Sequence, residues 1–428
     1  MNKHAIFHQA KSYLSYAFDQ NTIHLYLQTS RDDMMQVSLI YGDPFEWRHV
    51  GDEFTWVHHI EVMASSYQTS LFQYYFKAIK PFHKRVKYAF LIDIEDKRFL
   101  YGTQGLVDVT QKNLFDTYDL SHYFNFPYLN HEDVMDTPAW SKNMVWYQIF
   151  PDRFYTDTPH MDWHVTSIQN DDHFGGTLKG ITQKLDYLVD LGIQGIYFTP
   201  IFLAPSMHKY DTTDYFLIDP QFGTNDDFNT LVQEAHLRGI KVMLDGVFNH
   251  AGFFHPYFQD VMKHGEHSPY KDCFYIHEYP VINFELDDKG KPKRFPNVAN
   301  RYETFGFTPM MPKWNTSHPL VESHLLSVVE YWIKEFDIDG WRLDVSNEVS
   351  HDFLRKIRQT ARRIKPDVFI LGENWDASLP WLQGDQMDAV MNYDLSIPIW
   401  KFLEHTYDKE AFIEQLNRYL SRTPKHLI

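Results

Sequence analysis

Two acidic residues in separate motifs of this sequence have the chemistry of paired catalytic groups. In GWRLDVSNEV (340–349), Arg342 and Asp344 lie two residues apart on a predicted strand, so their side chains face the same side. A neighbouring cation favours the ionised form of a carboxylate, as a nucleophile requires. In ILGENW (370–375), Glu373 follows an apolar strand and a glycine, and Trp375 follows it closely. A carboxyl beside an aromatic wall loses hydration, and this favours its protonated form.

Each motif alone also has an ordinary structural explanation. Arg342 and Asp344 could form a buried structural ion pair, and Glu373 could cap a helix at a strand-to-helix turn. Together, two carboxylates at separate strand ends, one beside an arginine and one beside a tryptophan, are typical of a glycosidase. Carboxyl groups ~5–5.5 Å apart would indicate retention of anomeric configuration, and ~6.5–9.5 Å would indicate inversion.

Two further polar clusters follow apolar segments. In LDGVFNH (244–250), scaffold hydrogen bonds are the simpler interpretation for Asp245 and Asn249, whereas His250 is suited to donate to a sugar hydroxyl. In HKYDTTDY (208–215), Tyr210 could offer its ring face beneath a sugar, with ordinary loop packing as the alternative.

These motifs lie in a segment where short apolar strands alternate with helical stretches. Such alternation predicts a parallel sheet with helical crossovers. Each strand ends in a polar cluster, as in a TIM-type (β/α)8 barrel, where the chemistry sits at the carboxyl ends of the strands. The predicted strands are 144–150, 195–201, 240–247, 338–345, 368–373 and 388–393, and the predicted helices are 177–191, 226–238, 319–336, 350–364 and 376–384.

The fold class expected is α/β, an incomplete barrel of about six strands preceded by an N-terminal β-sandwich. Residues 1–120 carry alternating runs at 22–29, 36–41, 54–63, 71–79 and 87–94, which predict the sandwich. Residues 121–140 are expected to be a linker and 141–428 the barrel, with an excursion domain at about 251–319. Residues 425–428 could open a seventh strand, and the chain is expected to be truncated at its C-terminus.

The composition argues against several partners. The formal net charge is −17 and there is no lysine or arginine block, so neither nucleic acid nor an anionic membrane is expected to bind. The single cysteine, Cys273, excludes an intrachain disulfide and fits a reducing compartment. No signal peptide or membrane span is apparent, so a cytoplasmic location is expected. Aromatic residues, 17% of the chain, suit packing on the apolar faces of sugar rings.

The sequence resembles the α-amylase family of glycoside hydrolases, in its cyclomaltodextrinase, neopullulanase and maltogenic amylase branch. The MPK element and the DVSNEV ending point to this branch, and the N-terminal β-domain resembles its starch-binding-like domain. The motifs that carry the resemblance are VWYQIFPDRF (145–154), HKYDTTDYFLIDPQFG (208–223), DGVFNH (245–250), FTPMMPKWNT (307–316), GWRLDVSNEV (340–349), GENW (372–375) and GDQMDAVMNYD (384–394).

The resemblance implies roles for these residues. Asp344 would be the nucleophile, Glu373 the general acid/base, and Arg342 would keep Asp344 ionised and oriented. His208, Tyr210 and His250 would contact the sugar before the scissile bond. Trp375 would contact the sugar after it, and Asp245 and Asn249 would support binding.

The resemblance also implies the reaction and its substrates, namely retaining hydrolysis of α-1,4 bonds in cyclodextrins, pullulan and maltooligosaccharides. Relatives often transfer glycosyl groups as well, and many form homodimers, so both are possible here. No cofactor is required. Some relatives hold calcium near the loop 154–173, where Asp157, Asp162, Asp171 and Asp172 lack tight ligand spacing, so the metal site stays unassigned.

The sequence departs from the family at Trp314, where a smaller apolar residue is usual, and at Asn374, where a β-branched residue is usual. The family's third catalytic aspartate is not in this sequence. The alternative hypothesis is therefore an impaired α-glucan-binding fragment.

Overall fold

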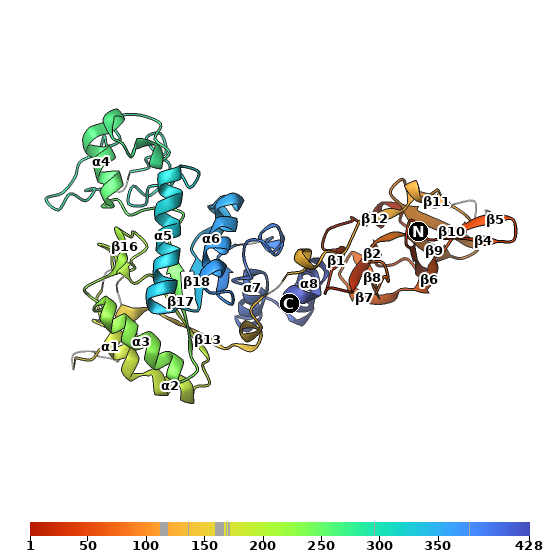
Figure 1. Cartoon of the computed structure of the whole chain (residues 1–428), viewed down its shortest axis with the longest axis horizontal. Helices are drawn as coiled ribbons and strands as arrows, with labels where there is room; N and C mark the ends of the chain where they lie inside the picture. The colour runs from red at the N-terminus through yellow and green to blue at the C-terminus, as the bar shows by residue number, and fades with distance from the viewer. Residues whose placement is uncertain are drawn as a thin grey trace. The chain divides into compact units, whose positions relative to one another are not determined.

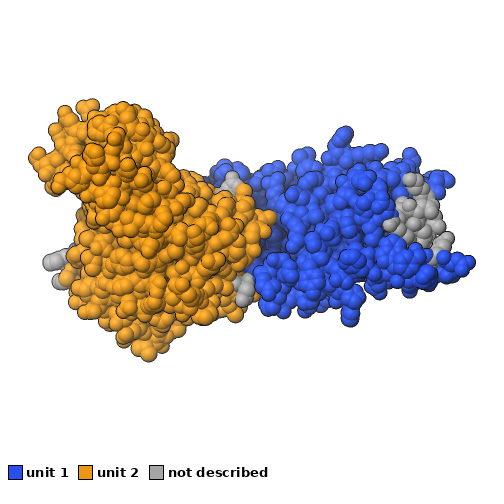
Figure 2. Space-filling model, turned by 45° about the horizontal axis from the view of Figure 1, so that its top comes forward, with its two compact units in different colours: residues 1–135, 392–428 blue, residues 136–391 orange. Residues whose placement is uncertain are grey.

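The computed structural model describes residues 1–111, 119–135, 137–158, 167, 169, 172–294, 296–375 and 377–428 (Figure 1). The chain forms two compact units, one of residues 1–135 and 392–428 and the other of residues 136–391 (Figure 2). Each unit contains its own cluster of buried apolar side chains, as expected of a domain. Among the described residues, no helix combines the length and apolar character needed to cross a membrane.

The first unit contains the predicted β-sandwich. Its strands are β1 (Ser15–Ala17), β2 (Ile23–Ser30), β3 (Gln36–Gly42), β6 (His59–Val62), β7 (Ala64–Gln68), β8 (Phe72–Ile79), β9 (Val86–Ile94), β10 (Lys97–Gly102), β11 (Gly105–Asp108) and β12 (Phe124–Phe126). One sheet has the order β1-β2-β8-β7, and the other has the order β11-β10-β9-β3-β6 with β12 paired to β9. Alternate residues of β2 and β3, including Leu25, Leu27, Val37 and Leu39, enter one core because successive side chains of a strand point to opposite faces.

Two parts of this unit differ from the predicted elements. The run 54–63 is two strands, because β5 (Glu53–Trp56) pairs with β4 (Trp47–Val50) while β6 pairs with β3. The unit also includes two unpredicted helices from the end of the chain, α7 (Tyr393–Leu403) and α8 (Lys409–Arg422).

The second unit is built on a parallel sheet with the order β13-β14-β17-β18-β19-β20. This is the arrangement of an incomplete TIM-type barrel, and the six predicted strands are confirmed. The strands are β13 (Trp146–Ile149), β14 (Gly195–Phe198), β17 (Lys241–Gly246), β18 (Gly340–Leu343), β19 (Phe369–Gly372) and β20 (Ala389–Val390). The helices between them are α1 (Leu178–Gln183), α2 (Leu185–Asp190), α3 (Asn225–Leu237), α5 (Pro319–Phe336) and α6 (His351–Ile364).

Local sequence signals set the ends of these helices. Thr224 and Asp227 form a capping box at the start of α3, and the Ser350 hydroxyl caps α6 by accepting from the backbone N–H of Phe353. α5 begins with Pro319 and ends at Phe336, and the next residue, Asp337, adopts a left-handed conformation. The inner faces of α3, α5 and α6 belong to the same apolar core as the sheet.

The chain between β17 and α5 forms an irregular insertion. It contains α4 (Pro256–His264), two short 3-10 turns at Gly265–His267 and Lys271–Cys273, and isolated bridges such as His250 to Lys313 and Phe274 to Trp314. A second small insertion, the hairpin of β15 (Phe202–Leu203) and β16 (Asp214–Ile218), follows β14. Both insertions leave the sheet at the carboxyl ends of its strands.

Two predicted elements are wrong. The predicted helix at 376–384 contains only a 3-10 turn at Leu379–Trp381 among its described residues, because Pro380 lacks a donor and Gly384 adopts a positive φ of 94°. Residues Lys425–Leu427 form a 3-10 helix instead of a strand, and the backbone N–H of Leu427 donates to the carbonyl of Pro424 at 2.9 Å. Four residues with only two apolar side chains do not distinguish a strand from a local turn.

Candidate active site

The carboxyl ends of three neighbouring strands bring the predicted acidic residues together. Asp245 lies near the end of β17, Asp344 directly follows β18, and Glu373 directly follows β19. Asp245 is the register partner of Arg342 on the adjacent strand, so both side chains leave the same face of the sheet. Residues distant in the sequence therefore share one edge of the sheet, as the strand-end motifs predict.

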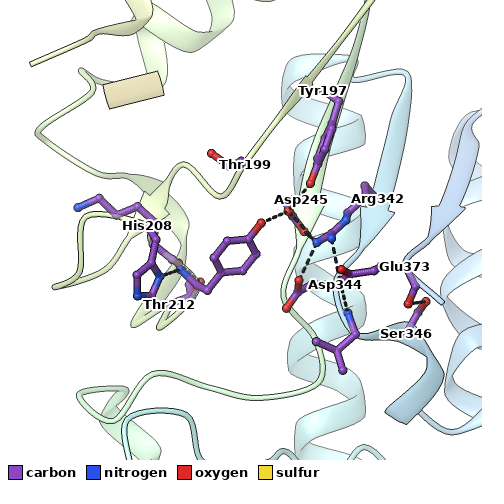
Figure 3. Close-up of polar contacts among 12 residues, drawn as sticks. Tyr197, Thr199, His208, Thr212, Asp245, Arg342, Asp344, Ser346 and Glu373 are labelled. Carbon is purple, nitrogen blue, oxygen red and sulfur yellow. Dashed lines mark hydrogen bonds and ion pairs between the residues drawn. The ribbon is translucent and has the colours of Figure 1, made fainter. Parts of the chain in front are cut away.

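Arg342 is the centre of this cluster (Figure 3). Its Nη1 donates to both oxygens of Asp245 at 3.0 Å and to Oδ1 of Asp344 at 2.7 Å. Its Nη2 lies 2.8 Å from Oε2 of Glu373. The planar guanidinium offers several donors in fixed directions, and one side chain therefore holds three carboxylates.

Asp245 has further donors that sequence reasoning missed. The hydroxyl of Tyr197 on β14 donates to Oδ2 of Asp245 at 2.9 Å, and that of Tyr210 donates to the same oxygen at 3.3 Å. The Asp245 side chain is fully buried. The simpler interpretation of Asp245 as a scaffold residue therefore describes its contacts in this structure. A tyrosine in an otherwise apolar buried strand needs a hydrogen-bond partner for its hydroxyl. This feature of the sequence could have predicted a polar contact for Tyr197.

The electrostatics of Asp344 differ from the expectation that Arg342 alone sets its ionisation. Burial raises the pKa of Asp344, the charge of Asp245 raises it further, and Arg342 opposes both effects. The charge of Glu373 also raises this pKa. Burial likewise raises the pKa of Asp245 against the effect of Arg342. The predicted net lowering of the Asp344 pKa is wrong, because burial and the charges of Asp245 and Glu373 outweigh the single guanidinium of Arg342.

Glu373 is held at the mouth of this cluster. Its side chain is 13% exposed, more than that of either aspartate. Oε2 also accepts from the backbone N–H of Val345 at 3.1 Å. Val345 is a buried β-branched residue with a φ of 46°, a conformation that is costly for this residue type. Trp375 is 65% exposed, so its ring is available to the solvent side of the site.

The loop that carries His208 and Tyr210 is held in place by the buried side chain of Lys209. Lys209 between them has a φ of 63° and a side chain only 2% exposed. Its Nζ donates to the carboxylate of Asp219 at 2.7 Å, to Oε1 of Gln221 at 2.6 Å and to the carbonyl of Ala204 at 3.0 Å. Sequence reasoning missed Lys209, because a lysine in a polar loop is ordinarily exposed.

The same loop contains a small polar network around His208. The Ser206 hydroxyl donates to Asp211 and lies 3.2 Å from Nδ1 of His208. The same ring nitrogen accepts from the backbone N–H of Tyr210 at 3.1 Å. Burial raises the pKa of Asp211. This network fixes the ring of His208 relative to Tyr210, whose hydroxyl donates to Asp245 in the carboxylate cluster.

His250 and Asn249 lie behind that loop. The His250 side chain is fully buried, and its Nε2 is 3.1 Å from the carbonyl oxygen of Tyr210. Burial lowers the pKa of His250 to about 3, so the neutral ring donates to this carbonyl. The Asn249 amide oxygen accepts from Nζ of Lys313, in the MPK element. In this structure both residues contact the protein, and their contact with a sugar stays a prediction.

A polar cleft lies beside these residues. Its lining comes from the insertion, from the turn after β18 and from the segment after β19. The residues that line it are Asn249, Tyr275, Lys313, Trp314, Thr316, Asn347, Glu348, Val349, Ser350, His351 and Trp381. Tyrosine and tryptophan rings beside hydrogen-bonding side chains suit a carbohydrate.

No metal site emerges from the part of the chain that the structure describes. Within it, no group of three or more His, Cys, Asp or Glu side chains is placed to hold an ion. Of the four aspartates in the loop 154–173, Asp162 and Asp171 lie outside the described residues. Asp157 accepts from the hydroxyl of Thr177 at 2.8 Å, and Asp172 accepts from a backbone N–H at 2.7 Å.

A parallel sheet whose strand ends gather carboxylates around an arginine, preceded by a β-sandwich, defines a glycoside hydrolase of the α-amylase class. The family model "Alpha amylase, catalytic domain" matches residues 148–427, and "Alpha amylase, N-terminal ig-like domain" matches residues 1–130. The chain belongs to the alpha-amylase family.

Within this family the chain is similar to cyclomaltodextrinases and maltogenic amylases. It is 44% identical to a cyclomaltodextrinase of Geobacillus thermopakistaniensis, over 100% of this chain and 70% of that protein. It is 41% identical to an intracellular maltogenic amylase of Bacillus subtilis (strain 168), over 97% of this chain and 68% of the relative. A solved cyclomaltodextrinase structure matches with a TM-score of 0.88 at 40% identity, covering 100% of this chain and 70% of that one.

Proposed function

We propose that the chain hydrolyses α-1,4-glucosidic bonds in cyclodextrins, pullulan and maltooligosaccharides with retention of configuration, and that it transfers glycosyl groups to sugar acceptors. The observation that carries the proposal is the binding of Asp344 and Glu373 to adjacent nitrogens of one guanidinium. This arrangement keeps the two carboxyl groups close together, as the retaining mechanism requires. The substrate class comes from the resemblance and from the names of the relatives.

In the first step, an oxygen of Asp344 attacks the anomeric carbon. The bond to the leaving sugar breaks as Glu373 gives its proton to the glycosidic oxygen, which leaves a covalent glycosyl-enzyme. In the second step, Glu373 takes a proton from water, and the water oxygen attacks the anomeric carbon and releases Asp344. A sugar hydroxyl in place of this water completes a transfer reaction.

The proton that the first step needs has a physical source in the cluster. Burial and the charges of neighbouring carboxylates raise the pKa of Asp344 and of Asp245, so the cluster holds a proton at a higher pH than isolated aspartates would. Glu373 is the most exposed of the three carboxylates, so we assign to it the transfer of this proton to the leaving group. Arg342 then stabilises the carboxylate that attacks.

The remaining site residues are proposed to bind substrate. Tyr210 directs its hydroxyl to Asp245 from the loop before β16, His208 is held beside it, and both would contact the sugar that is attacked. Trp375, with its exposed ring, would pack on the sugar that leaves. His250 supports Tyr210 through its backbone carbonyl, and it would reach a sugar only if this contact opened.

Three further expectations remain proposals. The reaction chemistry requires no cofactor, and calcium near the loop 154–173 is the one metal that the family resemblance implies. A homodimer is proposed on the same basis. A cytoplasmic location is supported by the single cysteine and by a relative named as an intracellular enzyme.

The proposal is tested by incubating the full chain with β-cyclodextrin. Maltose and glucose are expected, and the newly formed reducing end should first appear as the α-anomer in a proton NMR time course. Asp344→Asn and Glu373→Gln should each abolish turnover while β-cyclodextrin still binds in calorimetry. Binding by the parent chain without any product would instead indicate an α-glucan-binding protein, and a β-anomer as first product would refute retention.

A further inference from the structure

The turn after β18 makes three hydrogen-bond contacts with Glu373. The backbone N–H of Val345 donates to the carboxylate of Glu373 at 3.1 Å, and the N–H of Ser346 donates to the Glu373 backbone carbonyl at 3.2 Å. The Ser346 hydroxyl lies 2.9 Å from the same carbonyl oxygen (Figure 3). Side chain and main chain of the proposed acid are thus bound by two successive residues that directly follow the proposed nucleophile.

The backbone of this turn is held in an unfavourable conformation. Val345 has a φ of 46°, where a β-branched side chain is rarely found. This conformation points its N–H at Glu373, whereas an extended residue after β18 would continue the strand direction. A strained residue persists where surrounding contacts over-determine it, and the two contacts made by Ser346 are suited to that task.

The space around Ser346 is closely filled. Ser346 is fully buried, and its hydroxyl also lies 2.6 Å from Oδ1 of Asn374. A Cβ added to Gly372 would lie 2.9 Å from that hydroxyl oxygen and 2.0 Å from the sulfur of Met387. The end of β19 can therefore approach the turn only because residue 372 has no side chain. Such packing leaves the Ser346 hydroxyl a fixed position relative to Glu373.

We propose that Ser346 is a positioning residue that sets the direction of the Glu373 carboxyl group. Its N–H binds the Glu373 carbonyl, and its single hydroxyl hydrogen lies between that carbonyl and the Oδ1 of the following residue, Asn374. These contacts hold the turn and keep the Val345 N–H on the Glu373 carboxylate. The inference rests on the proposed role of Glu373 as general acid. Ser346 does not touch substrate in this scheme and acts only through Glu373.

The test compares two substrates that differ in their need for an acid. Maltotriose has a sugar leaving group that must be protonated, whereas α-maltosyl fluoride expels fluoride without such help. Because kcat/KM reports the first bond cleavage, Ser346→Ala should lower this value for maltotriose by about tenfold, the effect of one lost hydrogen bond. The value for α-maltosyl fluoride should fall by less than about twofold.

Two matched variants separate positioning from packing. Ser346→Cys fills the site with a slightly larger side chain that is only a weak donor, whereas Ser346→Ala leaves the site smaller, so a positioning role predicts the same selective loss in both. Ser421→Ala removes another buried serine hydroxyl, which donates to the Arg418 carbonyl at 3.0 Å in the other unit. It should leave the ratio of the two kcat/KM values unchanged.

The outcomes distinguish this inference from the proposed function. Glu373→Gln should lose maltotriose cleavage far more than fluoride cleavage; equal losses on both substrates would overturn the acid role itself. If Glu373→Gln discriminates between the substrates but both Ser346 variants lower the two values equally, Ser346 has only a structural role and the inference is overturned. Near-parental rates in both Ser346 variants would overturn it as well.

Discussion

Replacing Arg342 by lysine tests whether one guanidinium organises the three carboxylates. The Arg342 side chain is 5% exposed, and it contacts Asp245 and Asp344 through one terminal nitrogen and Glu373 through the other. Lysine has a single nitrogen at the end of a flexible chain and cannot reproduce the two-pronged fork. At least one carboxylate should therefore lose its cationic partner while it remains buried.

The size of the effect follows from that lost contact. Breaking a buried ion pair by removing one partner costs about 3–5 kcal/mol. Since each 1.4 kcal/mol corresponds to about a tenfold change in rate, kcat/KM for β-cyclodextrin should fall by roughly two to four orders of magnitude. Part of this cost will appear as proton uptake by the unpaired carboxyl group, so the acid limb of the pH profile should move to higher pH.

The assay is kcat/KM for β-cyclodextrin as a function of pH, with urea denaturation of each variant to confirm folding. Arg358→Lys is the matched control. Arg358 binds a different buried carboxylate, that of Asp388, at 2.7 Å. This control should lower stability and leave the pH profile in place. A folded Arg342→Lys variant with kcat/KM within about fivefold of the parent would refute the reasoning.

Three further changes test other parts of the structure. Gly372→Ala should lower turnover and the urea midpoint, because its methyl carbon would lie 2.0 Å from the sulfur of the buried Met387 and 2.9 Å from the Ser346 hydroxyl; parental activity and stability would contradict this packing. Burial lowers the pKa of His8 from 6.5 to about 4, so the unfolded chain binds a proton in that window and the folded chain does not. His8 should therefore contribute up to about 3 kcal/mol to the fall in stability from pH 7 to pH 4 measured by urea denaturation, alongside other buried histidines such as His24 and His426. His8→Gln should make this fall smaller by about that amount if the variant folds, and an unchanged fall would contradict the burial of a neutral His8. Lys209→Met leaves Asp219 buried without its cation, so stability should fall by about 3–5 kcal/mol; a change under about 1 kcal/mol would show that the pair does not hold the loop.

The strand pattern and the strand-end motifs were predictable because they are local in the sequence. Alternation and apolar runs located the six strands of the second unit to within a few residues, and therefore also the positions of Asp245, Asp344 and Glu373 at their ends. Parallel strands present their carboxyl ends at one edge, so the convergence of these residues followed from the fold class. Where the local signal was weak, as in 376–384 and 425–428, the predicted elements were wrong.

The partners within the site were decided by the tertiary structure. Spacing alone paired Arg342 with Asp344, but only the packing of neighbouring strands adds Asp245 and Glu373. Burial together with these two carboxylates reverses the expected shift in the pKa of Asp344. The partner of His250 was also decided by packing. The sequence predicted that His250 donates to a sugar hydroxyl, and in the structure its buried ring donates to the backbone carbonyl of Tyr210.

The sequence by itself therefore determined which residue types stand at which strand ends, because hydrophobic periodicity and turn signals act over a few residues. The tertiary structure alone decided which of these residues form hydrogen bonds, form ion pairs or are buried together. Those quantities depend on distances between segments about a hundred residues apart, as with Asp245 and Arg342, and on the water that packing removes from between them.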